Sequence, residues 1–136
     1  RSHCQSQQVI RGVLDGSARG VFQGKVHVAQ DAQKTDGQQM SRALLLSPKA
    51  EADAKPELEI YADDVICSHG ATVGELDETQ LFYLTSRGIS LDVARAMLIA
   101  AFLEDAVDMI ENADLSALLR PHVTGWMEVG EGTNDV

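Results

Sequence analysis

Aromatic residues, basic clusters and long apolar runs are all scarce in this chain of 136 residues. Phe, Trp and Tyr make up only 4% of it, which is low for one thick core and favours tight layers of small residues. Acidic residues outnumber Lys and Arg by 21 to 11, and the net charge of -10 makes nucleic acid an unexpected partner. The longest uncharged apolar run, residues 96–103, is too short to span a bilayer, so no membrane span is expected.

Cysteine is also scarce, and Cys4 and Cys67 form no tight disulfide framework. The two thiols could pair in principle, but so few cysteines in a chain of this size fit a reducing compartment better. Residues 1–12 have no apolar core and no small-residue cleavage pattern, so we expect no signal peptide there. The expected location is the cytoplasm.

Short apolar segments separated by turn residues fill the first part of the chain, and they predict β-strands at residues 9–14, 20–29, 43–47, 58–62 and 65–68. Val26 and Val28, like Leu58 and Ile60, alternate with polar neighbours, as half-buried strands do. The segments recur every 15 to 22 residues without helical patterns between them, which favours coils of a parallel β-helix over a doubly wound sheet. A sandwich of hairpins stays open, although the tight Asn-Gly hairpin signal is missing.

We therefore predict a mainly β chain with some α-structure: residues 1–75 form the final coils of a right-handed parallel β-helix, and residues 76–136 form a small helical domain. Solenoids need several coils and a cap, yet the strands begin near residue 9 without an amphipathic cap before them. Either the chain is part of a longer protein, or its first coil pairs with another molecule.

The helical part carries clear start and stop signals. Asp77 with Gln80 three residues later predicts a capped first helix, which Gly88 should end in a left-handed conformation, with Ile89 folding back on Leu84. A second helix should run from its cap at Ser90 to about residue 111, and its run 96–103 is apolar on every side, so another surface should cover it. A final turn or two from residue 114 should stop at residue 121, leaving a mobile tail from about residue 124.

Cys67 and His69 are the main candidates for chemistry. On a strand they would share a face, and both are metal-ligand types. Two alternatives stay open for Cys67: a small core residue, which is the commoner role of a buried cysteine, or a ligand or redox thiol. Two ligands fall short of the four that zinc or an iron–sulfur cluster usually takes, so a metal site here would need ligands from another chain.

Other reactive-looking residues have simpler interpretations. The acidic pairs around residues 57–64 are typical of solvated turns, and His3, His27 and His122 have no visible partner. A glycine-rich phosphate loop and an assignable Ser-His-Asp order are both missing. The residues therefore describe an interaction module and not an enzyme.

Three long blocks resemble the SufB/SufD family, the scaffold subunits of the cytoplasmic SufBCD machinery for iron–sulfur cluster assembly: KPELEIYADDV (residues 55–65), CSHGATVG (67–74) and LFYLTSRGI (81–89). The similarity extends from about residue 9 to residue 111. Family members are built as a right-handed parallel β-helix followed by a helical domain. The resemblance implies that this chain is the C-terminal portion of such a subunit.

The form of the motifs is SufD-like. The SufB-type subunit carries a cysteine, thought to hold the nascent cluster, where this chain has Leu84. The resemblance implies that His69, with Cys67 as a weaker neighbour, lies near the partner's cysteine at the junction with a SufB-type subunit. His69 is then the candidate iron ligand, and no cofactor is held stably by this chain alone. The iron–sulfur cluster would pass through the complex transiently.

The resemblance also implies that the helical domain docks SufC, an ABC-type ATPase that would supply the only catalysis. The residues expected to bind this partner lie between 77 and 103: Asp77, Leu81, Phe82, Arg87, Arg95, Met97, Leu98 and Phe102. Two other hypotheses remain. One is a stand-alone thiol and imidazole domain that binds metal or acts in redox chemistry. The other is a structural solenoid that forms a homodimer through its coil edge.

Overall fold

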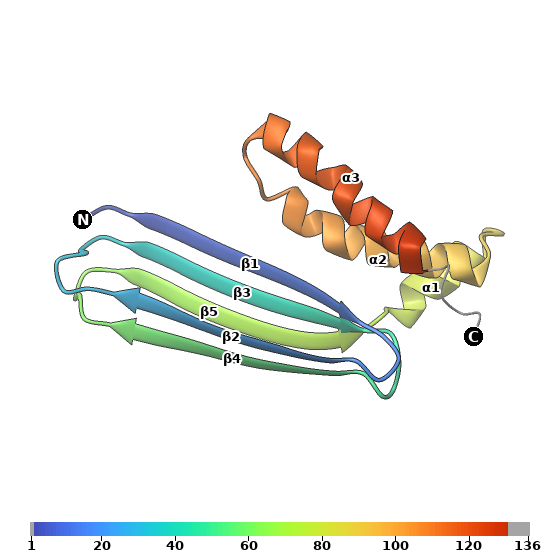
Figure 1. Ribbon diagram of the computed structural model, residues 1–136, viewed down its shortest axis with the longest axis horizontal. Coiled ribbons are helices and arrows are strands. Elements are labelled where there is room, and N and C mark those ends of the chain that lie inside the picture. The colour runs from blue at the N-terminus through green and yellow to red at the C-terminus, as the bar shows by residue number, and fades with distance from the viewer. Residues whose placement is uncertain (1, 131–136) are drawn as a thin grey trace. The chain divides into compact units, whose positions relative to one another are not determined.

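A computed structural model describes residues 2–130 and divides the chain into two compact units, residues 1–75 and 76–136. The first unit contains five strands of ten residues each and the second contains three helices, so the chain is mainly parallel β with α (Figure 1). The two units are described separately below. None of the helices in the described part of the chain is long and apolar enough to cross a membrane.

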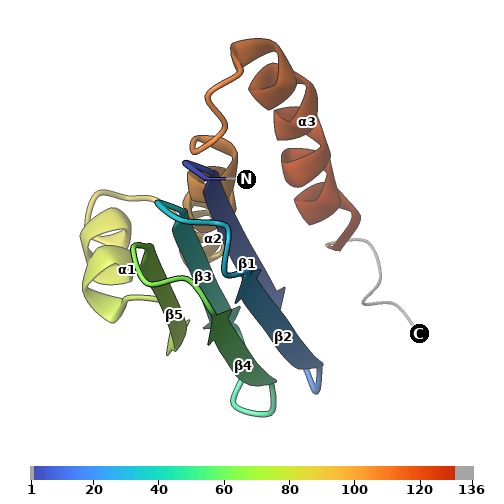
Figure 2. The ribbon, with the colours of Figure 1, turned by 90° about the vertical axis from the view of Figure 1, so that its left-hand side faces the viewer.

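The strands alternate between two parallel sheets, as the end-on view in Figure 2 shows. The odd-numbered strands form one sheet in the order β1-β3-β5, and the even-numbered strands form the other in the order β2-β4. Their bounds are β1 Gln5–Leu14, β2 Arg19–Val28, β3 Asp36–Leu45, β4 Glu51–Ile60 and β5 Ile66–Glu75. Each strand therefore pairs with the next strand but one in the sequence, and every pair is parallel.

The register of the three-stranded sheet is continuous from β1 to β5. Gln5 pairs with Asp36, and Asp36 pairs with Ile66, so one circuit of the chain takes 31 and then 30 residues. Partners in a parallel pair project their side chains from the same face of the sheet, so in-register rows of side chains run across all three strands. The corners stack as well: the amide of His3 donates to the carbonyl of Gln33, and the amide of Asp64 donates to the Gln33 side chain, both at 2.9 Å.

The strands extend further than the apolar segments predicted. β3 begins at Asp36 and not at residue 43, and β5 continues to Glu75, beyond the predicted end at residue 68. The inward face of β3 explains the difference. It includes Gly37, Gln39 and Ser41, which are buried although none has a large apolar side chain. A narrow space between two sheets accepts such small or hydrogen-bonded residues, and they carry no hydrophobic signal.

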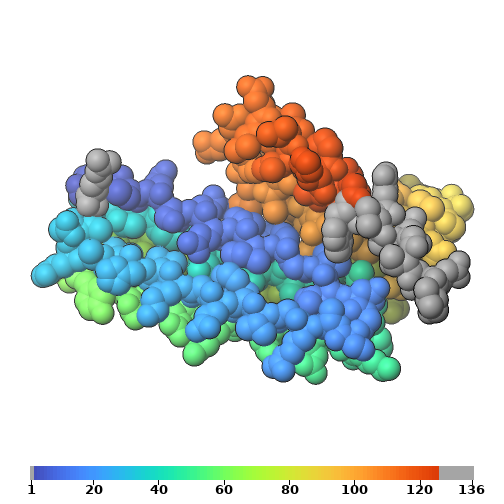
Figure 3. Space-filling view, in the orientation of Figure 1, coloured from blue at the N-terminus to red at the C-terminus, as the bar shows by residue number. Residues whose placement is uncertain are grey.

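The interior between the sheets is thin. Val28, Gln39 and Ser41 are among its buried residues, and Phe22 points toward the same space from β2. Gly24 of β2 is required by this close approach, because a Cβ built there would lie 2.6 Å from Phe22 Cζ and 3.0 Å from Gln39 Cδ. Figure 3 views the unit from the side of β1 and β2, whose side chains cover this interior from the viewer.

The outer face of the two-stranded sheet is charged, and ion pairs join β2 to β4, either between register partners or diagonally across two positions. Lys25 of β2 lies 2.6 Å from Glu59 and 3.8 Å from Glu57, and Arg19 lies 2.8 Å from Asp53. The hydrogen bond and the charge of Lys25 hold the pKa of Glu59 below its ordinary value, and the same contact raises the pKa of Lys25. The acidic residues Glu57 and Glu59 therefore serve sheet pairing within β4, and their interpretation as residues of a solvated turn is wrong.

The first helix of the second unit begins and ends as predicted. In α1 (Glu78–Thr85), Asp77 accepts hydrogen bonds from the amides of Thr79 at 2.8 Å and Gln80 at 3.2 Å. Gly88 has a φ of +88°, its amide donates to the Thr85 carbonyl, and the amide of Ile89 donates to the Leu84 carbonyl. These two bonds form the Schellman closure, which confirms that prediction.

The later helices differ from prediction. α2 (Leu91–Val107) is capped by Ser90 as expected but ends before residue 111, since the acidic residues Asp105 and Asp108 oppose the helix dipole there. α3 (Ala113–Gly130) continues through Pro121, so the predicted stop at that residue is wrong. A proline removes one helical hydrogen bond, but α3 packs against α2, where Arg120 lies 2.6 Å from Asp108 and 3.3 Å from Glu104. Of the predicted mobile tail, residues 124–130 belong to α3 and residues 131–136 lie outside the described residues.

The close approach at Gly24 predicts a steep response to an added methyl group. We expect Gly24→Ala to lower the free energy of unfolding by about 1–3 kcal/mol, because Gln39 and Phe22 are packed too tightly to move away freely. Urea denaturation followed by circular dichroism measures this. Gly12→Ala in β1 is the matched control, since nothing lies within 4 Å of a Cβ built at that position, and we expect a change within about 0.5 kcal/mol. Equal effects at the two glycines would contradict the packing described.

The ion pair on the outer face predicts a change in one pKa. Lys25→Met should raise the pKa of Glu59 toward its ordinary value, because the hydrogen bond and the positive charge are both lost. In the wild type, the lowered pKa gives stability that is present above the unfolded-state pKa of Glu59 and is lost as pH falls through the folded-state value. Carbon-detected NMR titration of the glutamate carboxyls measures the shift. Lys55→Met, which removes a cation 3.5 Å from Glu57, should leave Glu59 unchanged.

Candidate functional site

The candidate site lies on β5, at one edge of the three-stranded sheet. β5 pairs with β3 along one edge, and no strand among the described residues pairs with the other. Such an edge exposes a row of backbone N–H and C=O groups that another strand can complete. The site therefore combines the side chains of β5 with an open backbone ladder.

Cys67 and His69 share the inward face of β5, as predicted from their spacing. A Cβ built on Gly37 of β3 would lie 3.5 Å from Cys67 Sγ and 3.6 Å from Val26 Cγ1 of β2, so the thiol packs between the two sheets. Ile66 projects from the opposite face and is 71% exposed. The half-buried position of Cys67 favours the core interpretation of this residue, and no disulfide joins it to Cys4.

His69 is exposed although it lies on the inward face. Further along the same face of β5, Val73 is also 48% exposed, so the inward face of β5 is open to solvent from His69 onward. Covering this face with another strand would remove both the imidazole and the apolar side chain from water. The geometry thus places an accessible imidazole on a partly apolar face that no described strand covers.

The donor set is incomplete for a metal ion. Among residues 2–130, no cluster of three or more His, Cys, Asp or Glu side chains is arranged to hold one. Cys67 and His69 lie two residues apart on a strand, which separates their Cα atoms by about 6.6 Å. Iron or a cluster arriving here would find at most an imidazole and a half-buried thiol, and it would need further ligands from elsewhere.

A polar row that the sequence did not reveal runs into the site. Gln8 of β1, Gln39 of β3 and His69 of β5 are in register, so their side chains project from one face. Gln39 is 2% exposed, and its Nε2 donates to Gln8 Oε1 at 2.8 Å. Its Oε1 is buried and receives no hydrogen bond from the described residues. A buried acceptor without a hydrogen bond lowers the stability of the folded chain by about 1–3 kcal/mol. A donor that reached Gln39 Oε1 would therefore stabilise the sheet.

The residues predicted to bind a partner divide into structural and exposed groups. Asp77 caps α1, and Arg87 lies over the ring of Tyr83 with its Cζ 4.0 Å from the centroid, so both have roles within the helical unit. Phe82 is 72% exposed, whereas Leu81 is half-buried. The aromatic side chain of Phe82 is thus the accessible member of this group on α1.

On α2, the apolar run is covered on part of its circumference only. Arg95, Leu98 and Phe102 are half-buried, whereas Met97 is 47% exposed. Met97 belongs to an exposed stripe at helical spacing that comprises Val93, Met97 and Ala101. Val93 was not predicted; the signal that could have found it is its spacing of four residues from Met97.

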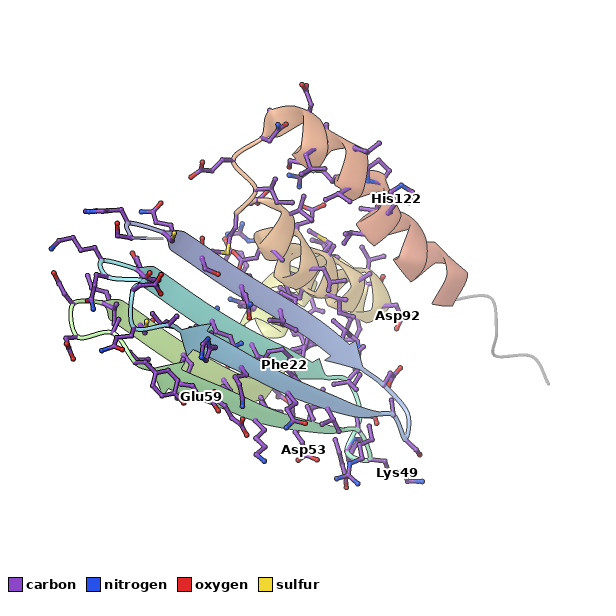
Figure 4. The ribbon with its side chains drawn as sticks, turned by 60° about the vertical axis from the view of Figure 1, so that its left-hand side comes forward. Phe22, Lys49, Asp53, Glu59, Asp92 and His122 are labelled. Carbon is purple, nitrogen blue, oxygen red and sulfur yellow. The ribbon has the colours of Figure 1, made fainter. Side chains whose placement is uncertain are left out.

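Figure 4 shows the side chains of both units and labels charged residues and a histidine that lie outside the candidate site. Asp53 and Glu59 lie on β4, where they pair with cations of β2, and they take no part in the β5 site. His122 lies on α3, in the other unit. The histidine that shares the inward face of an edge strand with a cysteine is His69.

Comparison with known proteins gives a consistent result. Residues 1–102 match the family model described as "SUF system FeS cluster assembly, SufBD core domain". The iron–sulfur cluster assembly protein SufD of Escherichia coli (strain K12) is 47% identical over 115 residues, which cover 85% of this chain and 27% of that protein. The chloroplastic protein ABCI7 of Arabidopsis thaliana is 44% identical over 115 residues, covering 85% of this chain and 24% of that protein.

A third relative agrees with these two. The iron–sulfur cluster assembly protein SufD of Bacillus subtilis (strain 168) is 43% identical over 97 residues, which cover 71% of this chain and 22% of that protein. The chain therefore spans about a quarter of the length of the curated relatives it matches.

Proposed function

Since the chain belongs to the SufB/SufD family of iron–sulfur cluster assembly proteins and is a SufD-like member, we propose that it is the C-terminal portion of a scaffold subunit of the SufBCD complex. In this proposal the subunit has no catalytic activity of its own and works in the cytoplasm. It offers one surface to a SufB-type subunit and another to the SufC ATPase. The observation that carries the proposal is the exposed His69 on the inward face of an edge strand.

The two sheets are proposed to be the final coils of a right-handed parallel β-helix. Support comes from the alternation of the strands between the sheets and from the repeat of about one coil per 31 residues. Such a coil ends in an edge that exposes backbone groups on each of its sheets. A SufB-type subunit with a matching edge can extend both ladders by strand addition.

At this junction His69 is proposed to contribute an imidazole to iron or to a nascent cluster, with Cys67 as a weaker neighbour. The cluster is cargo in this proposal and is held only while the partner supplies a thiolate and the remaining ligands. The incomplete donor set of the chain supports a shared site, because an imidazole and one half-buried thiol do not suffice alone. The chain by itself should therefore hold no cofactor stably.

The helical unit is proposed to dock SufC. The exposed apolar side chains of Phe82, Val93 and Met97 support this, because docking would remove them from water. Burying an exposed Phe or Met side chain contributes about 1.5–3 kcal/mol each to association. Leu84 stands where SufB-type subunits carry a cysteine, and its carbonyl closes α1, which supports a structural role for this position.

The junction hypothesis predicts a specific loss on substitution of His69. In the full-length subunit mixed with SufB- and SufC-type partners, we expect His69→Ala to leave the complex intact on gel filtration. Anaerobic cluster formation followed by absorbance should become slower by about tenfold or more, because one ligand is lost.

The matched control is His27→Ala, which removes an exposed histidine of β2 whose ring lies 5.4 Å from the ring of Tyr61 on the outer face. This control should assemble clusters at the wild-type rate. Failure of the wild-type subunit to bind the partners, or equal rates in the two variants, would overturn the proposal.

The alternative is a stand-alone domain that binds metal or acts in redox chemistry through Cys67 and His69. It is kept because both side chains share one face of β5. Reconstitution of the isolated chain with iron and sulfide under anaerobic conditions separates the two hypotheses. A scaffold that needs its partner should give little chromophore, whereas the alternative predicts stoichiometric uptake that Cys67→Ser abolishes. A homodimer through the coil edge is compatible with either outcome.

A further inference from the structure

The amide of Gln39 is held in one place by its surroundings. It lies on β3, the central strand of the sheet, and it is almost completely buried. On one side Nε2 donates to Gln8 Oε1 at 2.8 Å, and below it lies Gly24, which has no Cβ to obstruct the amide. A buried side chain fixed in this way is a rigid support.

The unsatisfied oxygen of this amide belongs to a strand that pairs directly with the strand of the candidate site. In a primary amide, the C=O bond and one of the two N–H bonds point in roughly opposite directions. Because the donor Nε2 is used by Gln8 on β1, a donor for Oε1 can come from the other neighbouring strand, β5. No donor among residues 2–130 reaches it.

The residue of β5 in register with Gln39 is His69. Neighbouring strands lie about 4.8 Å apart, so an imidazole in this row can reach Oε1 by a change of rotamer. The neighbours of His69 on the same face of β5 are poorer hydrogen-bond donors to Oε1. Cys67 offers a weak thiol donor that packs beside Gly37, and Ala71 offers no side-chain donor. Of these three residues, only His69 has a strong side-chain hydrogen-bond donor.

We propose that Gln39 is a positioning residue for His69: its Oε1 accepts the N–H of one ring nitrogen and thereby leaves the other ring nitrogen unprotonated and facing out of the coil. Histidines that bind metal ions usually donate their second nitrogen in this way, which fixes both the tautomer and the ring orientation. This inference rests on the proposed function for its purpose, but the contact itself needs no iron and no partner.

Fixing the tautomer matters at a junction that is assembled from two chains. An imidazole presents a lone pair at one nitrogen and a proton at the other, and only the lone pair can bind iron. The support therefore decides which nitrogen the arriving partner meets. It also satisfies the buried acceptor that the coil otherwise leaves without a donor.

NMR of the full chain with ¹⁵N-labelled histidine tests the contact directly. At a pH where the imidazole is neutral, the two ring-nitrogen shifts of His69 report its tautomer ratio. We expect this ratio to differ by about tenfold from that of N-acetylhistidine in the same buffer, which is the effect of one ordinary hydrogen bond. In Gln39→Met, which keeps the volume and removes the acceptor, the ratio should return to that of N-acetylhistidine.

Two further variants separate positioning from a general structural effect. Gln39→Glu keeps an acceptor oxygen, and Gln8 can turn its amide to donate, so the wild-type tautomer should be retained. Ser41→Ala removes another buried polar group of β3, two residues further along the same face, and should leave the ratio unchanged.

A wild-type ratio equal to that of N-acetylhistidine would overturn the inference even if no variant folds. So would a ratio that Gln39→Met leaves unchanged. Because the measurement uses neither iron nor partners, it can fail while the scaffold proposal stands, and the reverse also holds.

Discussion

Parallel pairing in continuous register is the constraint on which this molecule depends. Because each strand pairs with the next but one, the chain alternates between two sheets, and every circuit of the chain adds one strand to each sheet. The two sheets therefore present open backbone edges within the described residues. β5 forms one of these edges, so its side chains lie beside backbone groups that a further strand can pair with.

The space between the two sheets is thin. Two sheets this close leave room for glycine, serine and a hydrogen-bonded glutamine where a thicker core would demand large apolar residues. Such an interior can carry a polar row, and Gln8, Gln39 and His69 form one across the sheet. At the centre of this row, the amide oxygen of Gln39 is buried without a hydrogen bond, and at the edge of the sheet the imidazole of His69 is exposed.

The helical unit differs from the strand unit in what it leaves exposed. Its termini are satisfied internally by Asp77, Ser90 and the closure at Gly88, so each helix is defined without help from other chains. Its apolar surface is not satisfied, since the stripe of Val93, Met97 and Ala101 stays exposed. The strand unit thus offers directional backbone groups and the helical unit offers apolar area. Partners that bind the two should differ in kind.

Local signals in the sequence determined the number of strands and a part of each one, the parallel preference, the caps of α1 and α2, and the common face of Cys67 and His69, because each depends on a few neighbouring residues. The sequence also predicted a stop at Pro121, which packing of α3 against α2 overrides. Only the tertiary structure decided that Gln39 lies beside His69, since residues 30 apart become neighbours through register alone. Register is set by the summed pairing of whole strands and by the turns between them, and no single residue encodes it.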